Sequence, residues 1–405
     1  MRKFLLFISI LFISILITCT TKDGEITGFK PSYGSIFVSS NVSNAHIFLD
    51  YKNTGELTPA LINNVRVGRH IIHIFLSNHR PDVDSILVNV NEGEETNINF
   101  ELINVPNVGN LNISTNPDSA IVYINKLQFG YSPLEINGML AGGYKIRIIK
   151  GSYEAIEKNI QISQNQTTQI LENLTLKRFV LFEHYSNTYC LPCVDVDVII
   201  EDVINQLVPF GVISLGYHPN IPGPSDPFYL AARPENDARR AYYSVPFSPY
   251  AVVDGVKIIV TTSLSQLEQN IRTAISEREQ IQPKVTVDIF DYKKSVDEIS
   301  GRIKVTALEN LGTNVFLRIA LIERSIETEN PPGSNGQTHF FDVLRDFQQS
   351  NAAGTPIMLS MNQEKSVQFQ FVRDAEWGTD LDVIAFLQDD ATKEIIQATW
   401  TAIFD

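Results

Sequence analysis

An internal repeat constrains the fold of the first half of this chain. The segment that starts at Gly34 lines up with the segment that starts at Gly109, an offset of 75 residues, and Thr58-Pro59 lines up with Ser132-Pro133. Each copy alternates apolar and polar residues between glycine, asparagine and proline positions, which is the pattern of half-buried strands and hairpins. The repeat therefore predicts two tandem all-β modules.

The two modules resemble the PEGA repeat, a small β-sandwich of bacterial envelope proteins. Asn116 to Ala120 keeps the proline and the alanine of its Pro-x-Gly-Ala turn, and the first copy keeps Ala45. The resemblance covers about 33–177 and implies a spacer or a weak-binding module without catalysis. A cell-envelope protein or a glycan stays open as the partner of the repeats. We expect repeat 1 at 33–103 and repeat 2 at 109–177.

One of the three cysteines, Cys19, closes an N-terminal leader. Residues 1–18 combine basic Arg2 and Lys3 with an apolar run. The run is shorter than the roughly 20 residues of a membrane-spanning helix, as is typical of a secretory signal. Leu16 to Cys19 resembles the lipobox of bacterial lipoproteins, which implies cleavage before the cysteine and its diacylation. The alternative is an ordinary signal peptide with a chance cysteine.

Lipidation of Cys19 would anchor the mature chain to a membrane. Each buried methylene of an acyl chain contributes about 0.8 kcal/mol, so two or three chains anchor stably. Residues 19–32 are polar and contain glycine and proline, as a tether does. We expect a lipid-anchored protein of the cell envelope, with the outer membrane as its membrane and either the periplasmic or the surface face.

The net charge of the chain limits the classes of partner that it can bind. The chain of 405 residues is long enough for several domains and has a formal net charge of −14. An acidic chain of this kind is a poor ligand for nucleic acid and binds anionic membranes poorly through basic patches. We expect no cofactor.

The other two cysteines form the motif Cys190-Leu-Pro-Cys193. An apolar strand pattern at 178–183 precedes the motif, and apolar residues at helical spacing follow it. A cysteine at a helix N-terminus is stabilised as a thiolate, which attacks a disulfide, and the second cysteine resolves the mixed disulfide. Export implies an oxidising compartment, where the pair would form a Cys190–Cys193 disulfide.

Strand, loop, Cys-x-x-Cys and helix in this order resemble a thioredoxin-like domain, here at 178–282. Val245 to Gly255 is similar to the thioredoxin segment in which a cis-proline begins a strand. The resemblance implies catalytic roles for three residues: Cys190 as nucleophile, Cys193 as resolver, and a cis Pro249 that shapes the substrate groove.

Several residues depart from the thioredoxin pattern. Tyr189 stands where tryptophan usually precedes the first cysteine, and His184 stands where a proton-accepting carboxylate is usually buried. Glu183 is one residue away and could serve instead. We expect Asp195 and Asp197 in the first helical turn, where they would raise the pKa of a nearby thiol.

Two other interpretations of the cysteine pair stay open. The first is an oxidised but inert local disulfide. The second is a metal site, for which two cysteines supply half of the ligands and His184 and His218 could supply the rest.

A further resemblance joins this part to the C-terminal part. His218-Pro219, Asp226 to Tyr229 and Arg239 to Tyr243 are similar to segments of the outer membrane protein 28 family of Bacteroidetes lipoproteins. That family joins a thioredoxin-like domain to a β-sandwich, and the resemblance covers roughly 178–405. It implies an envelope location and leaves the activity undefined.

Residues 283–405 alternate as strands with polar breaks, which predicts an immunoglobulin-like β-sandwich. The predicted strands are 283–290, 301–308, 315–322, 367–372, 383–387 and 395–400. A long loop, Glu329 to Gly336, is either a binding loop or a solvated connection.

The sequence thus predicts a multidomain chain. Its parts are a signal peptide and tether, two small β-sandwich repeats, an α/β thioredoxin-like domain and a β-sandwich. The function it favours is thiol-disulfide exchange on the thiols or disulfides of exported proteins. The alternative is a non-catalytic surface or outer-membrane adaptor with a structural disulfide.

Overall fold

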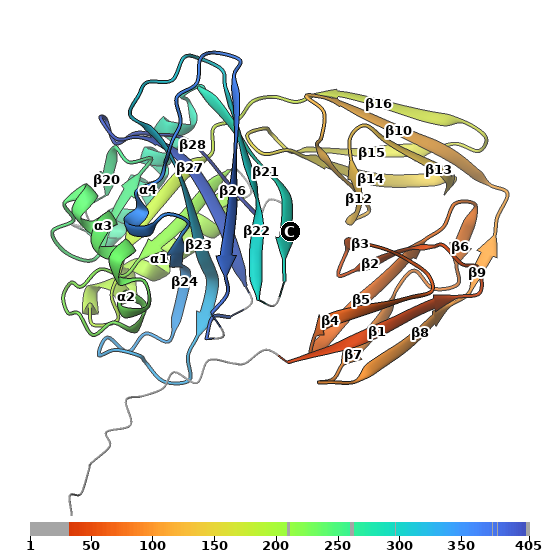
Figure 1. Ribbon diagram of the computed structural model, residues 1–405, viewed down its shortest axis with the longest axis horizontal. Coiled ribbons are helices and arrows are strands. Elements are labelled where there is room, and N and C mark those ends of the chain that lie inside the picture. The colour runs from red at the N-terminus through yellow and green to blue at the C-terminus, as the bar shows by residue number, and fades with distance from the viewer. Residues whose placement is uncertain are drawn as a thin grey trace, which may run out of the picture.

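The computed structural model describes residues 32–208, 211–259, 263–295, 297–374, 376–378 and 380–401. These residues form mostly strands, and the α-helices are confined to one stretch in the middle of the chain (Figure 1). The expected signal peptide, Cys19 and nearly all of the tether lie outside the described residues. No helix in the described ranges has both the length and the apolar character needed to cross a membrane.

The first repeat folds as two facing sheets around one core. One sheet has the order β4-β1-β8 and the other the order β3-β2-β5-β7, while β6 pairs with β9. The strands are β1 (Tyr33–Ser40), β2 (His46–Leu49), β3 (Lys52–Leu57), β4 (Ala60–Arg66), β5 (Gly68–Phe75), β6 (His79–Pro81), β7 (Ile86–Val90), β8 (Glu95–Phe100) and β9 (Leu102–Asn104).

The second repeat has the same topology, so the prediction of two β-sandwich repeats is confirmed. Its sheets have the orders β13-β10-β16 and β12-β11-β14-β15, and its first and last strands pair in parallel, as β1 and β8 do. The strands are β10 (Val108–Asn116), β11 (Ile121–Ile124), β12 (Leu127–Tyr131), β13 (Leu134–Leu140), β14 (Gly142–Ile149), β15 (Ile156–Ile162) and β16 (Thr167–Asn173).

The shared Thr-Pro and Ser-Pro signature has a structural reason in both repeats. The hydroxyl of Thr58 accepts the amide N–H of buried Ala45 at 3.1 Å and lies 2.6 Å from the Ser40 hydroxyl. In the second repeat, Ser132 accepts the N–H of Ala120 at 3.0 Å. Each hydroxyl therefore satisfies a buried backbone group that would otherwise lack a partner.

The two repeats contact each other directly. The ring of Phe129 lies 5.2 Å from that of Phe48 and 5.2 Å from that of Phe75. The backbones also meet, because the N–H of Gln128 donates to the carbonyl of Tyr51 at 2.9 Å. An apolar and hydrogen-bonded junction of this kind resists bending between the repeats.

The helical stretch follows the second repeat and contains a βαβ unit. Strands β17 and β18 are parallel with α1 between them, and the hairpin of β19 and β20 joins β17 on its other side. The elements are β17 (Val180–Tyr185), α1 (Leu191–Leu207), β18 (Val212–Tyr217), α2 (Pro227–Ala231), α3 (Arg233–Tyr243), β19 (Tyr250–Val253), β20 (Lys257–Ile259) and α4 (Leu264–Glu279).

A single large sheet crosses the predicted domain boundary at 282/283. Its order is β20-β19-β17-β18-β24-β23-β27-β28, with β25 paired to β23. Strand β24 joins the two halves, because it pairs in parallel with β18 and antiparallel with β23. The strands are β23 (Val315–Glu327), β24 (His339–Phe347), β25 (Thr355–Pro356), β27 (Leu381–Asp389) and β28 (Ile395–Trp400).

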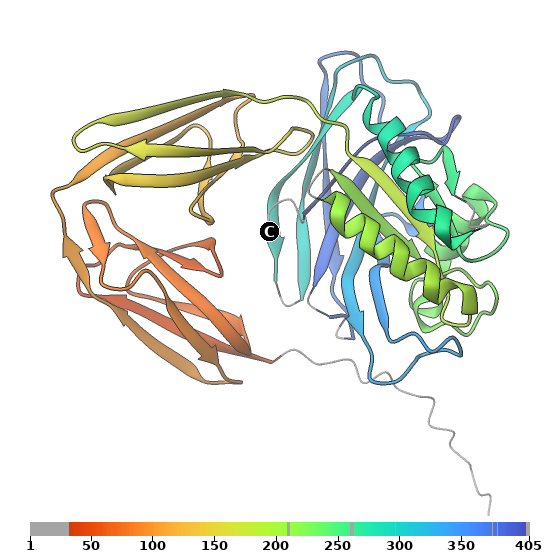
Figure 2. The same ribbon diagram turned by 180° about the vertical axis from the view of Figure 1, so that it is seen from behind.

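Elements cover both faces of the large sheet. Figure 2 shows α1 and α4 across one face, and the small sheet β21-β22-β26 packs on that same face through a core that includes Ile319 and Leu321 of β23. A second core under the opposite face joins Leu181 and Leu215 to Phe386 and Trp400. The remaining elements are β21 (Val285–Lys294), β22 (Glu298–Ala307), β26 (Glu364–Val372) and the short helix η2 (Ser350–Ala352).

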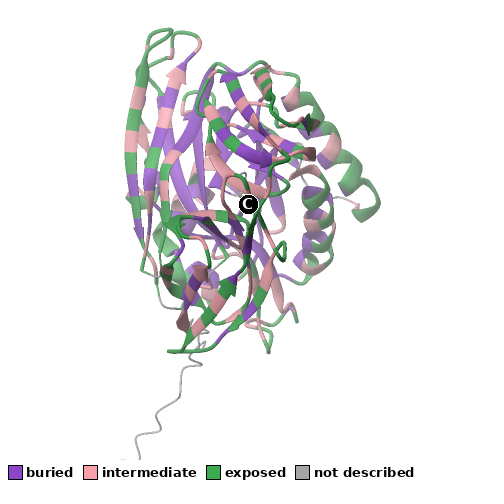
Figure 3. Cartoon of the chain, turned by 90° about the vertical axis from the view of Figure 1, so that its right-hand side faces the viewer, coloured by how far each residue is buried: buried purple, intermediate pink, exposed green. Residues whose placement is uncertain are grey.

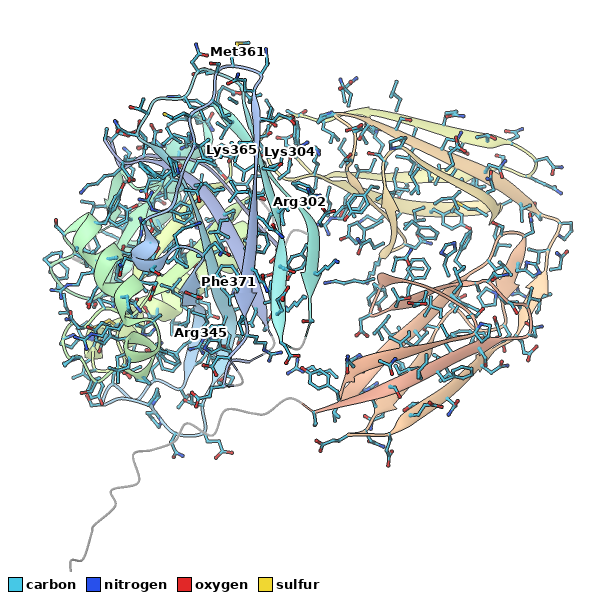
Figure 4. The ribbon with its side chains drawn as sticks, viewed as in Figure 1. Arg302, Lys304, Arg345, Met361, Lys365 and Phe371 are labelled. Atoms are coloured by element: carbon cyan, nitrogen blue, oxygen red, sulfur yellow. A yellow bond between two sulfur atoms is a disulfide. The ribbon has the colours of Figure 1, made fainter. Side chains whose placement is uncertain are left out.

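Burial follows these layers. The inner strands of the large sheet are almost continuously buried, whereas β22 and β26 of the small sheet alternate between more buried and more exposed residues (Figure 3). Arg302 and Lys304 of β22 stand on the outward face of the small sheet (Figure 4), while Phe371 of β26 packs into the core. The 178–282 and 283–405 segments thus share one sheet and its cores.

Candidate functional site

Cys190 is the N-cap residue of α1, and a disulfide joins it to Cys193. The predicted disulfide is therefore present. Both cysteines are buried, with exposed fractions of 3% for Cys190 and 0% for Cys193. A nucleophile of another protein needs direct access to a sulfur atom, and this burial leaves little surface for it.

A loop from the C-terminal part lies over the cysteine motif. The N–H of Asn335 donates to the carbonyl of Thr188 at 3.0 Å. Its side-chain amide donates to the carbonyls of Asn187 at 3.3 Å and Cys190 at 3.4 Å. The loop Glu329 to Gly336, whose role the sequence leaves open, is thus packed against the backbone that leads into the cysteine motif.

Gly333 fits this loop because its backbone passes close to the cysteine motif. A Cβ atom at position 333 would lie 2.1 Å from the carbonyl oxygen of Thr188, well inside van der Waals contact. Only glycine allows this approach without a shift of the loop.

The expectation that Asp195 and Asp197 lie in the first turn of the helix is wrong. Helix α1 begins at Leu191, and its first turn contains no acidic residue. Asp195 is exposed on the second turn, where it faces water. Asp197 faces inward instead, so the two carboxylates have different roles.

Asp197 is a buried carboxyl group on the cysteine helix. It accepts hydrogen bonds from the hydroxyl of Ser186 at 2.6 Å and from the side-chain amide of Gln337 at 3.2 Å. Burial raises the pKa of Asp197 to about 6, and the hydrogen bonds with Ser186 and Gln337 oppose that shift. This carboxyl group links β17, α1 and the loop that covers the disulfide.

His184 lies on the α1 side of β17. Its ring stacks on Phe341 of β24, with centroids 4.7 Å apart. Burial lowers the pKa of His184 to about 3, and nearby His218 adds to the shift. Neither ring nitrogen has a hydrogen-bond partner among the described residues. His184 is therefore a neutral packing residue.

Glu183 cannot accept a proton from Cys190, because it points to the opposite face of the sheet. Its neighbours there are Arg239, with Nη2 2.5 Å from Oε1, and the hydroxyls of Tyr217 at 2.9 Å and Tyr243 at 2.6 Å. Adjacent strand residues face opposite sides, and it is Phe182 and His184 that face α1. Glu183 serves a buried ion pair instead.

Pro249 lies at the end of the sheet where β17 leads toward the cysteine motif and α1. The Ser248–Pro249 peptide bond is cis, as the resemblance implies. Tyr250 begins β19 and pairs with Tyr185, the last residue of β17. The cis-proline therefore enters the sheet at the end that leads to the cysteine motif.

The histidines proposed as metal ligands have other partners or none. His218 Nδ1 lies 2.9 Å from Asp226, which also accepts the N–H of Thr188 at 2.7 Å. Over the described ranges, no group of three or more histidine, cysteine, aspartate or glutamate residues is arranged to hold a metal ion. Both cysteine sulfurs are committed to the disulfide.

Asn335 and Gln337 were missed by the sequence reasoning. They lie about 145 residues after the cysteines, and neither belongs to a spaced motif. The long glycine-rich loop was the one available signal, and it carries no information on what the loop contacts.

Comparison with known families identifies the repeats. Residues 33–106 and 108–178 each match the PEGA domain. The predicted resemblance is confirmed for this part of the chain. No curated protein matches the sequence.

Three solved structures show partial likeness to this chain. HBP35 of Porphyromonas gingivalis has 14% identity and a TM-score of 0.47, over 56% of this chain and 76% of that one. A DUF3823 family protein of Bacteroides ovatus has 8% identity and a TM-score of 0.17, over 72% and 97%. GBS52, a minor pilin of Streptococcus agalactiae, has 8% identity and a TM-score of 0.15, over 36% and 96%.

Proposed function

We propose that this protein is a non-catalytic adaptor of the bacterial cell envelope, in which two PEGA repeats carry a β-rich binding unit with a structural disulfide. One observation carries the proposal: both cysteines are buried beneath a loop that hydrogen-bonds to their own motif. An exchange enzyme presents its attacking sulfur to a protein substrate, and a covered disulfide does not.

The repeats support the spacer part of the proposal. Their contact through Phe129 fixes repeat 1 on repeat 2. Repeat 2 is fixed in turn to the following part, since Ser152 accepts the N–H of Val287 at 2.8 Å and donates to its carbonyl at 3.2 Å. A semi-rigid arm of this kind would hold the C-terminal unit away from the membrane. Its partner would be an envelope protein or a glycan.

The envelope location rests on the leader and its cysteine. The mature chain would begin at lipidated Cys19, and Cys19→Ala would release the protein into the water phase of a detergent partition or leave the leader uncleaved. A native mature form that stays in the water phase with an unmodified N-terminus would contradict the anchor. The C-terminal part resembles the outer membrane protein 28 family, which agrees with this location.

An insulin-reduction assay on the full chain tests the absence of catalysis. We expect the native protein and Cys190→Ser to give the same background rate at equal concentration, with a thioredoxin as positive control. A native rate at least about ten times that of Cys190→Ser would overturn the adaptor proposal.

Thiol-disulfide exchange is the second candidate, and the local architecture favours it. Cys190 caps α1 directly after a buried strand, and a cis-proline enters the same end of the sheet. This is the arrangement expected of a thioredoxin-like domain. In that case Cys190 would be the nucleophile and Cys193 the resolver. The reduction potential of the pair would then set the direction of exchange.

A further inference from the structure

The cysteine motif and the loop that covers it come from distant parts of the chain. We define the cover loop as residues 329–337. We propose that the cover loop is a gate: it must move away before the Cys190–Cys193 disulfide can react with a thiol, and a local opening is enough to make it react. This goes beyond the adaptor function, because it gives the disulfide a second, reactive state.

Hydrogen bonds hold the cover loop on the motif, in addition to the close approach of Gly333. Asn335 is the one buried residue of the loop, and it binds the backbone of the motif through both its amide groups. The side chain of Gln337 adds the hydrogen bond to Asp197. No apolar side chain of residues 329–337 is buried. Opening therefore exposes little apolar surface and should cost less than unfolding the sheet.

The two ends of the cover loop are held together by contacts that do not involve the cysteine motif. The N–H of Thr328 donates to the carbonyl of Thr338 at 2.9 Å, and the flanking strands β23 and β24 pair up to His339. The loop can thus lift while its two ends stay in the sheet. Gly333 sets how closely it sits, because no side chain fits between it and Thr188.

The chemical step is reduction by a dithiol such as dithiothreitol. Its thiolate attacks one sulfur of the pair, a mixed disulfide forms, and the other cysteine leaves as a thiolate that takes up a proton. The second thiol of the reagent then releases the first cysteine and closes the oxidised ring. The protein gains two thiols, and the reagent loses two electrons and two protons.

The test measures this reduction in the folded full-length protein. Samples in dithiothreitol are quenched with iodoacetamide at intervals, and the labelled cysteines are counted by mass spectrometry. Gly333→Ala pushes the loop away, and Gln337→Ala removes its bond to Asp197. We expect reduction at least about ten times faster in Gly333→Ala and several times faster in Gln337→Ala.

Two matched controls separate the gate from general effects. A Cβ at Gly312 meets nothing within 4 Å, and Gln368 is exposed on β26, so Gly312→Ala and Gln368→Ala should stay within about twofold of the native rate. If Gly333→Ala does not fold, the reduction rate of Gln337→Ala alone tests the gate. Native-like rates in both loop variants would overturn the gate.

Low urea distinguishes local opening from global unfolding. Opening of the cover loop exposes little surface, so the native reduction rate should change little with urea below the unfolding transition. A rate that rises as steeply with urea as the unfolding equilibrium constant would also overturn the gate. Neither result bears on the adaptor function, which the insulin assay tests with the loop intact.

Discussion

Asp197 and His184 lie on the α1 side of the large sheet, and burial favours the uncharged form of each. The pKa of Asp197 rises to about 6 and the pKa of His184 falls to about 3. Near neutral pH, His184 is uncharged without a loss of folding free energy. Asp197, in contrast, must ionise in a buried environment. Helix α1, which carries the cysteines, therefore contains a buried carboxyl group whose ionisation destabilises the folded state.

Replacement of Asp197 by asparagine should remove a destabilising contribution that grows as pH rises. The folded pKa lies above the unfolded value of 3.8, so the native state holds a proton that the unfolded state has lost between about pH 4 and pH 6. The contribution of Asp197 to the stability of the native protein therefore falls across this window as pH rises. Relative to its value at pH 4, the advantage of Asp197→Asn should grow by about 2 kcal/mol at pH 7.

Urea unfolding followed by tryptophan fluorescence measures this difference. Both tryptophans, Trp377 and Trp400, lie in the C-terminal part, so the signal reports the unit that contains Asp197 and not the repeats. Subtracting the native curve from the variant curve removes the contribution of His184. Asp195→Asn, at an exposed position on the same helix, is the control and should show no such trend. A pH-independent difference for Asp197→Asn would contradict the argument.

At the scale of elements, the sequence predicted most of the strands, including the fully buried β17, β27 and β28, and missed β24. The alternation of apolar and polar residues predicted the β-sandwiches of the repeats, and the helical spacing of apolar residues after Cys193 predicted α1. Strand β24 was not among the predicted strands, because residues 339–347 place the buried charged residues Asp342 and Arg345 among apolar ones and do not alternate. The contacts of Asn335 were also beyond prediction, since they depend on how a distant loop packs.

The repeat signature gives a prediction at this scale. Thr58→Val keeps the size of the side chain but removes the hydroxyl that pairs with the N–H of Ala45. A buried unpaired amide costs about 1–3 kcal/mol. We expect residues 33–106 to exchange amide hydrogens roughly five to 150 times faster in this variant, as measured by mass spectrometry of the full chain.

Thr96→Val is the matched control for this substitution. Its hydroxyl makes one long contact, 3.4 Å to the carbonyl of Asn89, near the surface. Exchange in repeat 1 should stay near the native rate. Equal rates in Thr58→Val and Thr96→Val would mean that the hydroxyl of the signature does not stabilise the repeat.

At the scale of the whole molecule, the repeats and the remainder are built differently. Each repeat has its own core, and Phe75 of repeat 1 also packs against the core of repeat 2. The segments 178–282 and 283–405, predicted as separate domains, share a sheet, and one core takes side chains from both. Sequence patterns indicate which face of a single strand or helix is buried. They do not reveal that two sheets become continuous through a single strand such as β24.

Fragments of the chain test this difference in construction. The fragment 178–405 should fold without the repeats and keep native tryptophan fluorescence, since its cores stay complete. The fragment 178–282 should not fold alone, because it loses the core contacts of Phe386 and Trp400 and leaves β18 as an open edge with no β24 beside it. Far-UV circular dichroism with urea titration distinguishes the outcomes. A cooperative transition in 178–282 would mean that the shared sheet joins two independent domains, and a disordered 178–405 would mean that the docking of Ser152 on Val287 is required for folding.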